Sequence, residues 1–163
     1  MGQIVLVTGG ARSGKSAFAE RYAAHCAAKM RARVAYIATA QVYDEEMRQR
    51  VDLHQARRPS GWATYEAPFD TENAIRAAGA EHGVILFDCI TMFLSNDMLQ
   101  YPEKEQERDS FALHVEERIH ALIQAAEEID ATTIFVTNEV GAGIVPEHRL
   151  GRLYRDMAGL ANQ

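Results

Sequence analysis

The stretch "GGARSGKS" at residues 9–16 constrains the fold of this chain more than any other part of the sequence. It follows the apolar run "IVLVT" at residues 4–8, which predicts a buried strand, and apolar residues at helical spacing come after it. The stretch matches the phosphate-binding loop G-x-x-x-x-G-K-[ST] at every fixed position. In such a loop the backbone N–H groups and the positive end of the next helix surround phosphates. A glycine-rich turn with an incidental lysine is the alternative. The predicted nucleotide contacts are Gly9, Gly10, Ala11, Arg12, Ser13, Gly14, Lys15 and Ser16.

Two side chains of this loop and one acidic residue elsewhere predict catalytic chemistry. Lys15 is expected to reach the β- and γ-phosphates, and the Ser16 hydroxyl is expected to ligate Mg²⁺. Asp88 follows the apolar run "VILF" and would end a strand at the sheet edge where ligands of parallel sheets bind. Proteins with this loop commonly hold Mg²⁺ with such an acid. The sequence therefore predicts a metal site formed by Ser16 and Asp88. An aspartate that merely caps the next turn is the alternative for Asp88.

Strand and helix patterns alternate along the rest of the chain. Apolar runs predict strands at 33–40, 83–89 and 132–138, and a short strand at "ATYEA" after the break "RPSGW". Helical spacing predicts helices over 44–57, near 70–80, over 103–129 and from Pro146 onward. We therefore expect a single P-loop α/β domain over residues 1–163, with a mostly parallel sheet flanked by helices.

Composition limits the classes of function. The formal net charge of −6 argues against nucleic-acid binding, which favours a basic face. No apolar stretch approaches the roughly 18 residues that cross a bilayer, so we expect no stable membrane insertion. Cys26 and Cys89 lack the spacing of metal ligands, which suggests reduced thiols in a cytoplasmic protein. The short chain and the lack of an Asn-Lys-x-Asp motif favour a small-molecule kinase over a motor or signalling GTPase.

Segments spread over nearly the whole chain carry a family resemblance. They are the phosphate-binding loop, "YIATAQ", "DEEMRQRVDLHQARRPSGW", "FDCITMFLSN" and "VTNEVGAGIVPEHRLGRLYRDMAGLANQ". In these segments the chain resembles the bifunctional adenosylcobinamide kinase/adenosylcobinamide-phosphate guanylyltransferase family of cobalamin biosynthesis. The resemblance implies that the protein phosphorylates adenosylcobinamide, with ATP or GTP as donor. It also implies that GMP is then transferred from GTP to this phosphate, giving adenosylcobinamide-GDP and pyrophosphate.

The resemblance assigns the second reaction to His54, the histidine of the motif His-x-x-x-Arg-Pro. It implies that His54 becomes guanylylated, and a neutral imidazole nitrogen is a competent nucleophile on the α-phosphorus. Arg57 and Arg58 follow about one turn later and are placed to neutralise phosphate charge. The residues alone leave another interpretation open. Met47, Val51 and His54 share one helical face, so His54 would equally suit a packed core.

Other features implied by the resemblance have simple alternatives. Thr39, Ala40 and Gln41 resemble a nucleotide-contacting segment, whereas a strand-to-helix turn explains them equally well. Glu66 resembles a residue that contacts the guanine nucleotide, and a solvated surface carboxylate is its alternative. The family resemblance also implies a homo-oligomer, a homotrimer with sites between its subunits. Members of the family continue past the position of Gln163 with a final strand, so we expect this edge strand to be absent here.

Three functions remain open from the sequence. The first is the bifunctional kinase and guanylyltransferase. The second is a P-loop small-molecule kinase without guanylyl transfer, in which His54 is only structural. The third is an inactive nucleotide-binding module. A label transferred from the α-phosphate of GTP to the chain would separate the first from the other two.

Overall fold

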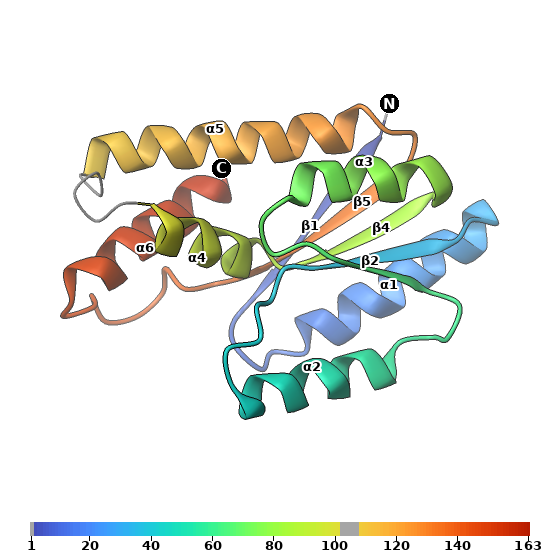
Figure 1. Cartoon of the computed structure of the whole chain (residues 1–163), viewed down its shortest axis with the longest axis horizontal. Coiled ribbons are helices and arrows are strands. Elements are labelled where there is room, and N and C mark those ends of the chain that lie inside the picture. The colour runs from blue at the N-terminus through green and yellow to red at the C-terminus, as the bar shows by residue number, and fades with distance from the viewer. Residues whose placement is uncertain (1, 102–107) are drawn as a thin grey trace.

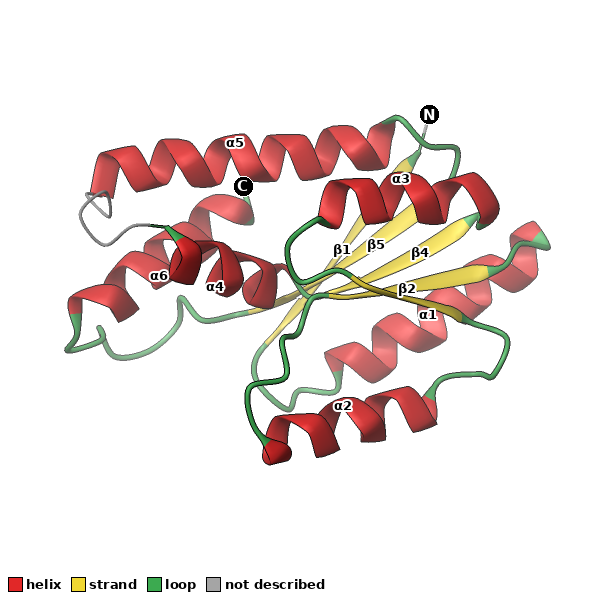
Figure 2. Ribbon diagram, in the orientation of Figure 1, coloured by secondary structure: helices red, strands yellow, loops and turns green. Residues whose placement is uncertain are grey.

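The computed structural model describes residues 2–101 and 108–163, in which five parallel strands form one sheet with helices on both faces (Figure 1, Figure 2). The order across the sheet is β1-β5-β4-β2-β3. The strands are β1 (Gln3–Gly9), β2 (Val34–Ala38), β3 (Ala63–Glu66), β4 (Val84–Asp88) and β5 (Thr132–Asn138). The helices are α1 (Lys15–Met30), α2 (Glu45–Arg57), α3 (Thr71–Glu81), α4 (Ile90–Gln100), α5 (Arg108–Glu127) and α6 (Arg149–Ala161). The predicted α/β fold with a parallel sheet is confirmed.

The parallel register brings the carboxyl ends of all five strands to one edge of the sheet. Gly9 pairs with Asn138 at the ends of β1 and β5, and Ala38 pairs with Asp88 at the ends of β2 and β4. The glycine-rich loop after β1 and the loops after the other strands therefore converge at this edge. Ligands of open parallel sheets bind at this edge.

Side chains that alternate along the strands give the sheet two apolar faces. Tyr36 and Leu86 point to the face that α1 covers, together with the buried alanines of that helix. Ile37 and Phe87 point to the opposite face, where α3, α4, α5 and α6 pack. Figure 1 shows this division, with α1 and α2 on one side of the sheet and the other four helices on the opposite side.

The predicted strands agree with the structure, but two helices differ from expectation. The sequence did not predict α4, because most of its residues, among them Ile90, Phe93 and Leu94, are buried. A helix that is apolar on most sides lacks the polar face by which a surface helix is recognised. The predicted start of the last helix at Pro146 is wrong, since α6 begins at Arg149. Pro146 instead lies in the preceding loop, where its carbonyl accepts a hydrogen bond from Arg152.

The predicted helix over 103–129 corresponds to α5, and its first residues lie outside the described part of the chain. Within residues 2–101 and 108–163, none of the helices combines the length and apolar character that a bilayer crossing requires.

Candidate functional site

The glycine-rich loop adopts a turn that its glycines make possible. Gly14, directly before α1, has φ 84°, in the left-handed region that side chains disfavour. A Cβ atom on Gly9 would lie 2.7 Å from the Oγ atom of Ser13, so a larger residue at position 9 would displace the Ser13 side chain. The Ser13 N–H donates to the Gly10 carbonyl at 3.3 Å and closes the turn. The N-terminus of α1 thus faces the carboxyl edge of the sheet, as anion binding requires.

A pocket of about 620 Å³ lies at this edge and is the centre of the candidate site. Helix α1, helix α2 and the ends of strands β2, β3 and β4 all contribute to its wall. The residues that line it include Ser16, Ala40, Gln41, His54, Arg58, Glu66 and Asp88, all of which the sequence predicted as site residues. The fold therefore gathers the predicted metal residues and the predicted guanylyl-transfer residues from distant parts of the chain around one space.

Ser16 and Asp88 have the chemistry of an Mg²⁺ site. One Asp88 carboxylate oxygen, Oδ2, accepts a hydrogen bond of 2.8 Å from the Tyr36 hydroxyl. Within the described residues the other oxygen makes no hydrogen bond and is available to a cation. The described part of the chain holds no group of three or more His, Cys, Asp or Glu side chains suited to a metal. Two oxygen ligands supplemented by phosphates and water are what Mg²⁺ in nucleotide sites uses, so these residues fit that ion.

Burial and charge keep two neighbouring groups protonated. Burial, and next the charge of Asp88, raise the pKa of Tyr36, so its hydroxyl remains a hydrogen-bond donor. The same two causes raise the pKa of Cys89 to about 11. Because the thiolate is the nucleophilic form, Cys89 is a poor nucleophile at neutral pH although it lines the pocket.

Helix α2 presents His54 to the pocket. Met47, Val51 and His54 share one face, as predicted, but that face lines the pocket and none of the three is fully buried. This placement argues against the alternative of a packed core histidine. Asp44 caps the start of the helix, and its carboxylate accepts a hydrogen bond of 2.7 Å from the Met47 N–H. Within the described residues the His54 ring makes no hydrogen bond, so both ring nitrogens are available for chemistry.

A cationic group lies at the end of α2. Arg58 lines the pocket, and its Nη1 atom donates to the Thr64 hydroxyl at 3.2 Å. The central carbon of its guanidinium lies 3.3 Å from the centroid of the Tyr36 ring, a cation–π contact. The side chain of Arg57, also predicted to contact phosphate, lies outside the described residues.

The remaining loop residues lie beside the pocket. The Lys15 Nζ atom donates to the Gly10 carbonyl at 3.1 Å. Lys15 lines a separate hollow along β1 together with Gly9, Ser13 and Gly14. Gly10, Ala11 and Arg12 are exposed on the loop, and Arg12 has φ 56°. Lys15 directly precedes Ser16, which lines the pocket, so the glycine-rich loop borders both spaces.

The geometry argues against the predicted nucleotide contact of Thr39. Its side chain is fully buried, and its hydroxyl donates to the Cys89 carbonyl at 2.9 Å and accepts from the Cys89 N–H at 2.8 Å. Its backbone N–H donates to the Asp88 carbonyl, and its carbonyl accepts from Asn96 at 2.7 Å. Every polar group of Thr39 is therefore used within the protein. Thr39 positions the turn that carries Asp88.

Sequence reasoning missed the groups that hold the pocket wall. Asn96 on α4 is buried, and its amide donates both to the Thr39 carbonyl and to the Pro68 carbonyl at 2.9 Å. It joins the loop after β2 to the loop after β3. Tyr36 was hidden within an apolar strand, and only the pairing of β2 with β4 places its hydroxyl beside Asp88. No local pattern in the sequence carries this information.

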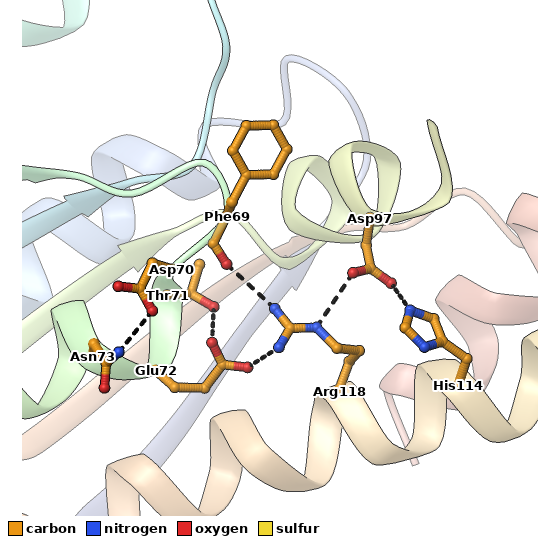
Figure 3. Close-up of polar contacts among 8 residues, drawn as sticks. All are labelled: Phe69, Asp70, Thr71, Glu72, Asn73, Asp97, His114 and Arg118. Atoms are coloured by element: carbon orange, nitrogen blue, oxygen red, sulfur yellow. Dashed lines mark hydrogen bonds and ion pairs between the residues drawn. The ribbon is translucent and has the colours of Figure 1, made fainter. Parts of the chain in front are cut away.

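A network of ion pairs and hydrogen bonds joins α3, α4 and α5 (Figure 3). Arg118 pairs with Glu72, contacts Asp97 through its Nε atom at 3.2 Å, and donates to the Phe69 carbonyl at 3.3 Å. Asp97 also contacts the His114 ring at 2.6 Å. Figure 3 shows Arg118 between the two carboxylates, with the loop before α3 held by its guanidinium. The network fixes the β3–α3 loop that supplies Pro68 to the pocket wall.

Comparison with known proteins gives matches along nearly the full chain. Residues 5–163 match the family described as CobU, cobinamide kinase / cobinamide phosphate guanyltransferase. The bifunctional adenosylcobalamin biosynthesis protein CobU of Escherichia coli is 40% identical over 164 residues, covering 98% of this chain and 88% of that protein. CobU of Salmonella typhimurium matches with the same identity and coverage. CobP of Pseudomonas aeruginosa is 39% identical over 160 residues, covering 97% of this chain and 84% of that protein.

A solved structure, a KaiC-like protein of Pyrococcus horikoshii, covers 96% of this chain and 67% of its own at 16% identity. Its TM-score of 0.47 adds no weight to the assignment. The family match and the curated relatives agree with each other and with the resemblance carried by the motifs. This chain belongs to the cobinamide kinase / cobinamide phosphate guanyltransferase family.

Proposed function

We propose that this protein phosphorylates adenosylcobinamide and then transfers GMP from GTP to the product, through a guanylylated His54. The observation that carries the proposal is that His54 and Arg58 line the same pocket as Ser16 and Asp88. A nucleotide whose phosphates lie against the glycine-rich loop would then extend past the imidazole. The curated relatives, named bifunctional adenosylcobalamin biosynthesis proteins, support the pairing of the two reactions.

In the kinase step, a hydroxyl oxygen of adenosylcobinamide attacks the γ-phosphorus of ATP or GTP. A bond from that oxygen to phosphorus forms, the bond to the β-phosphate oxygen breaks, and the hydroxyl proton is lost to solvent. The transition state spreads negative charge over the phosphoryl oxygens, so positioning and cations supply most of the catalysis. Lys15 and the N–H groups of residues 9–16 bind the phosphates. Ser16 and Asp88 would hold Mg²⁺, which neutralises charge on the phosphates when it is bound.

In the guanylyl step, a neutral nitrogen of His54 attacks the α-phosphorus of GTP. A nitrogen–phosphorus bond forms, and the bond to the bridging oxygen breaks, which releases pyrophosphate. A phosphate oxygen of adenosylcobinamide phosphate then attacks the same phosphorus and displaces His54, giving adenosylcobinamide-GDP. Arg58 neutralises phosphate charge, and Gln41 and Glu66 line the pocket where they can contact the nucleotide.

The proposal includes assembly and location. A homo-oligomer, by family resemblance a trimer, is supported by apolar side chains on the loop after β5: Ile144 is 97% exposed and Val145 is 63% exposed. A cytoplasmic location is supported by Cys26 and Cys89, which form no disulfide. Light scattering of the purified protein measures the number of subunits directly.

Product analysis tests the proposed function. The protein is incubated with Mg²⁺, adenosylcobinamide and either ATP or GTP, and the corrinoids are separated by chromatography and weighed by mass spectrometry. We expect adenosylcobinamide phosphate with a phosphate donor, and adenosylcobinamide-GDP with pyrophosphate when GTP is present. Adenosylcobinamide phosphate without adenosylcobinamide-GDP would mean that the protein has the kinase activity alone. Nucleotide binding without either product would mean that the protein binds nucleotide but catalyses neither reaction.

A further inference from the structure

Tyr36 contacts two groups to which the proposed function gives different tasks. Its hydroxyl donates to Asp88 Oδ2 at 2.8 Å, and its ring lies 3.3 Å from the guanidinium carbon of Arg58. The side chain is only 3% exposed, yet it belongs to the pocket wall. It thus lies between the acid assigned to the metal and the cation at the end of the helix that carries His54.

The contacts of Arg58 show how strongly it depends on this ring. Its Nη1 atom has one hydrogen bond, to the exposed Thr64 hydroxyl. Its Nε atom is buried and has no hydrogen-bond acceptor among the described residues. Arg58 also ends α2, where its N–H donates to the Gln55 carbonyl at 3.1 Å. The ring of Tyr36 is therefore the main contact that holds the guanidinium against the sheet.

The contact with Asp88 has a different consequence. The hydrogen bond from Tyr36 fixes one carboxylate oxygen and leaves the other toward the pocket. A carboxylate held in one orientation binds a cation better than one that rotates freely, because less conformational entropy is lost on binding. The strand pairing of β2 with β4 keeps hydroxyl and carboxylate together.

We propose that Tyr36 is a positioning residue that joins the two halves of the site, orienting Asp88 through its hydroxyl and seating Arg58 through its ring. This inference rests on the proposed function, since it gives Asp88 and Arg58 the tasks described above. It separates two effects within one side chain. The hydroxyl serves metal binding, and the ring serves the guanylyl-transfer end of the pocket.

Two substitutions test the two effects separately. Tyr36→Phe keeps the ring and removes the hydroxyl, so we expect the Mg²⁺ concentration for half-maximal rate to rise about tenfold. We also expect weaker binding of Mn²⁺ to the protein loaded with α,β-methylene GTP, which cannot form the adduct, measured by electron paramagnetic resonance. Formation of the covalent GMP adduct at saturating metal should stay within about twofold of the parent. Tyr36→Leu removes the ring as well, and we expect adduct formation at saturating metal to fall about tenfold or more.

Double substitution and a matched control complete the experiment. Tyr36→Leu combined with Arg58→Ala should form the adduct no more slowly than Arg58→Ala alone, because the ring acts through Arg58. Tyr154→Phe removes another part-buried hydroxyl, which donates to the Thr91 carbonyl at 2.7 Å, and should leave the Mg²⁺ requirement unchanged. Circular dichroism melting confirms that each variant is folded.

The outcomes distinguish this inference from the proposed function. Unchanged Mn²⁺ binding in a folded Tyr36→Phe variant, with a parent that forms the adduct, would overturn the task given to the hydroxyl. Additive losses in the double variant would overturn the task given to the ring. A parent protein that forms no GMP adduct would contradict the proposed function itself, whereas the Mn²⁺ measurement on Tyr36→Phe would still report on the hydroxyl.

Discussion

The charged groups of the pocket differ in how far the fold restrains them. Asp88 receives a hydrogen bond from Tyr36, and Arg58 contacts both the Tyr36 ring and Thr64. The His54 ring has no hydrogen bond among the described residues. Groups that stabilise charge benefit from a fixed position, because no reorganisation is then needed during the reaction. The nucleophile that we propose, His54, would instead have to move to the phosphorus and away again, which a ring without hydrogen bonds permits.

Replacing Lys15 with alanine should reduce both reactions. The substitution removes a positive charge beside the transferred phosphoryl group, so we expect the kinase rate to fall by at least about a hundredfold. The fold should be retained because the side chain is on the loop surface, and its hydrogen bond among the described residues is to the Gly10 carbonyl. Steady-state rates of both reactions give the measurement. Lys29→Ala, at the exposed far end of α1, is the control. Undiminished guanylyl transfer in Lys15→Ala would mean that GTP binds elsewhere.

Replacing Asp88 with asparagine should act on the metal. The amide lacks the charge that attracts Mg²⁺, so we expect the half-saturating Mg²⁺ concentration to rise by about tenfold or more. Nucleotide affinity, measured by titration calorimetry, should change by less than about threefold. Asp130→Asn, in the exposed turn before β5, should behave as the parent. An identical Mg²⁺ requirement in Asp88→Asn and the parent would remove Asp88 from the metal site.

Among the elements, α2 and α4 contrast most in what their sequences reveal. The charged sequence of α2, with acids in its first turn, predicted a helix over 44–57, in agreement with Glu45–Arg57. The sequence of α4 did not predict a helix, because buried residues lie on most sides of it and no polar face marks the helical period. The polar groups of α4 were missed for the same reason. Asn96 and Asp97 hold the neighbouring loops only after α4 packs against the sheet.

The Arg118 network should contribute measurably to stability. Arg118→Met would remove the cation from Glu72 and leave Asp97 with only the His114 ring, and these carboxylate side chains are only 12% and 16% exposed. We expect a loss of about 2–3 kcal/mol in the free energy of unfolding, at the low end for a broken buried pair because solvent reaches part of the network. The melting temperature should fall by about 5–10 °C.

A matched ion pair on the surface provides the control. Arg76 pairs with Glu128 at 2.8 Å, and these side chains are 42% and 43% exposed. Arg76→Met should therefore cost less than about 1 kcal/mol. Equal melting temperatures for the Arg118 and Arg76 variants would contradict a stabilising role for the buried network.

At the scale of the whole molecule, the fold class followed from the order of strand and helix patterns. The site followed only in part. The glycine-rich loop and the strand-ending Asp88 are local patterns, and the resemblance identified His54. The contacts of Tyr36 and Thr39 depend on which strands become neighbours, and β2 pairs with β4 although α2, β3 and α3 separate them in sequence. A single sequence does not contain that pairing, so it predicts neither the hydrogen bonds of Thr39 nor those of Tyr36.

Nucleotide binding should stabilise the whole fold, because the site draws on α1, α2 and the ends of β2, β3 and β4. A ligand at a hundred times its dissociation constant adds about 2.7 kcal/mol to the free energy of unfolding. We therefore expect Mg²⁺ with GTP to raise the melting temperature by about 5–10 °C in differential scanning fluorimetry. Lys15→Ala should show a smaller rise at the same concentration. No rise in the parent protein would contradict nucleotide binding at this edge of the sheet.

The most direct measurement of the central claim is covalent labelling of a His54→Ala variant. Parent, His54→Ala and His25→Ala, an exposed histidine of α1, are incubated with α-labelled GTP and Mg²⁺ and separated by denaturing electrophoresis. We predict acid-labile label on the parent and on His25→Ala, and none on His54→Ala. Phosphorylation of adenosylcobinamide by His54→Ala should remain largely intact, because that step needs only positioning and charge neutralisation. Label that persists on His54→Ala would contradict the account.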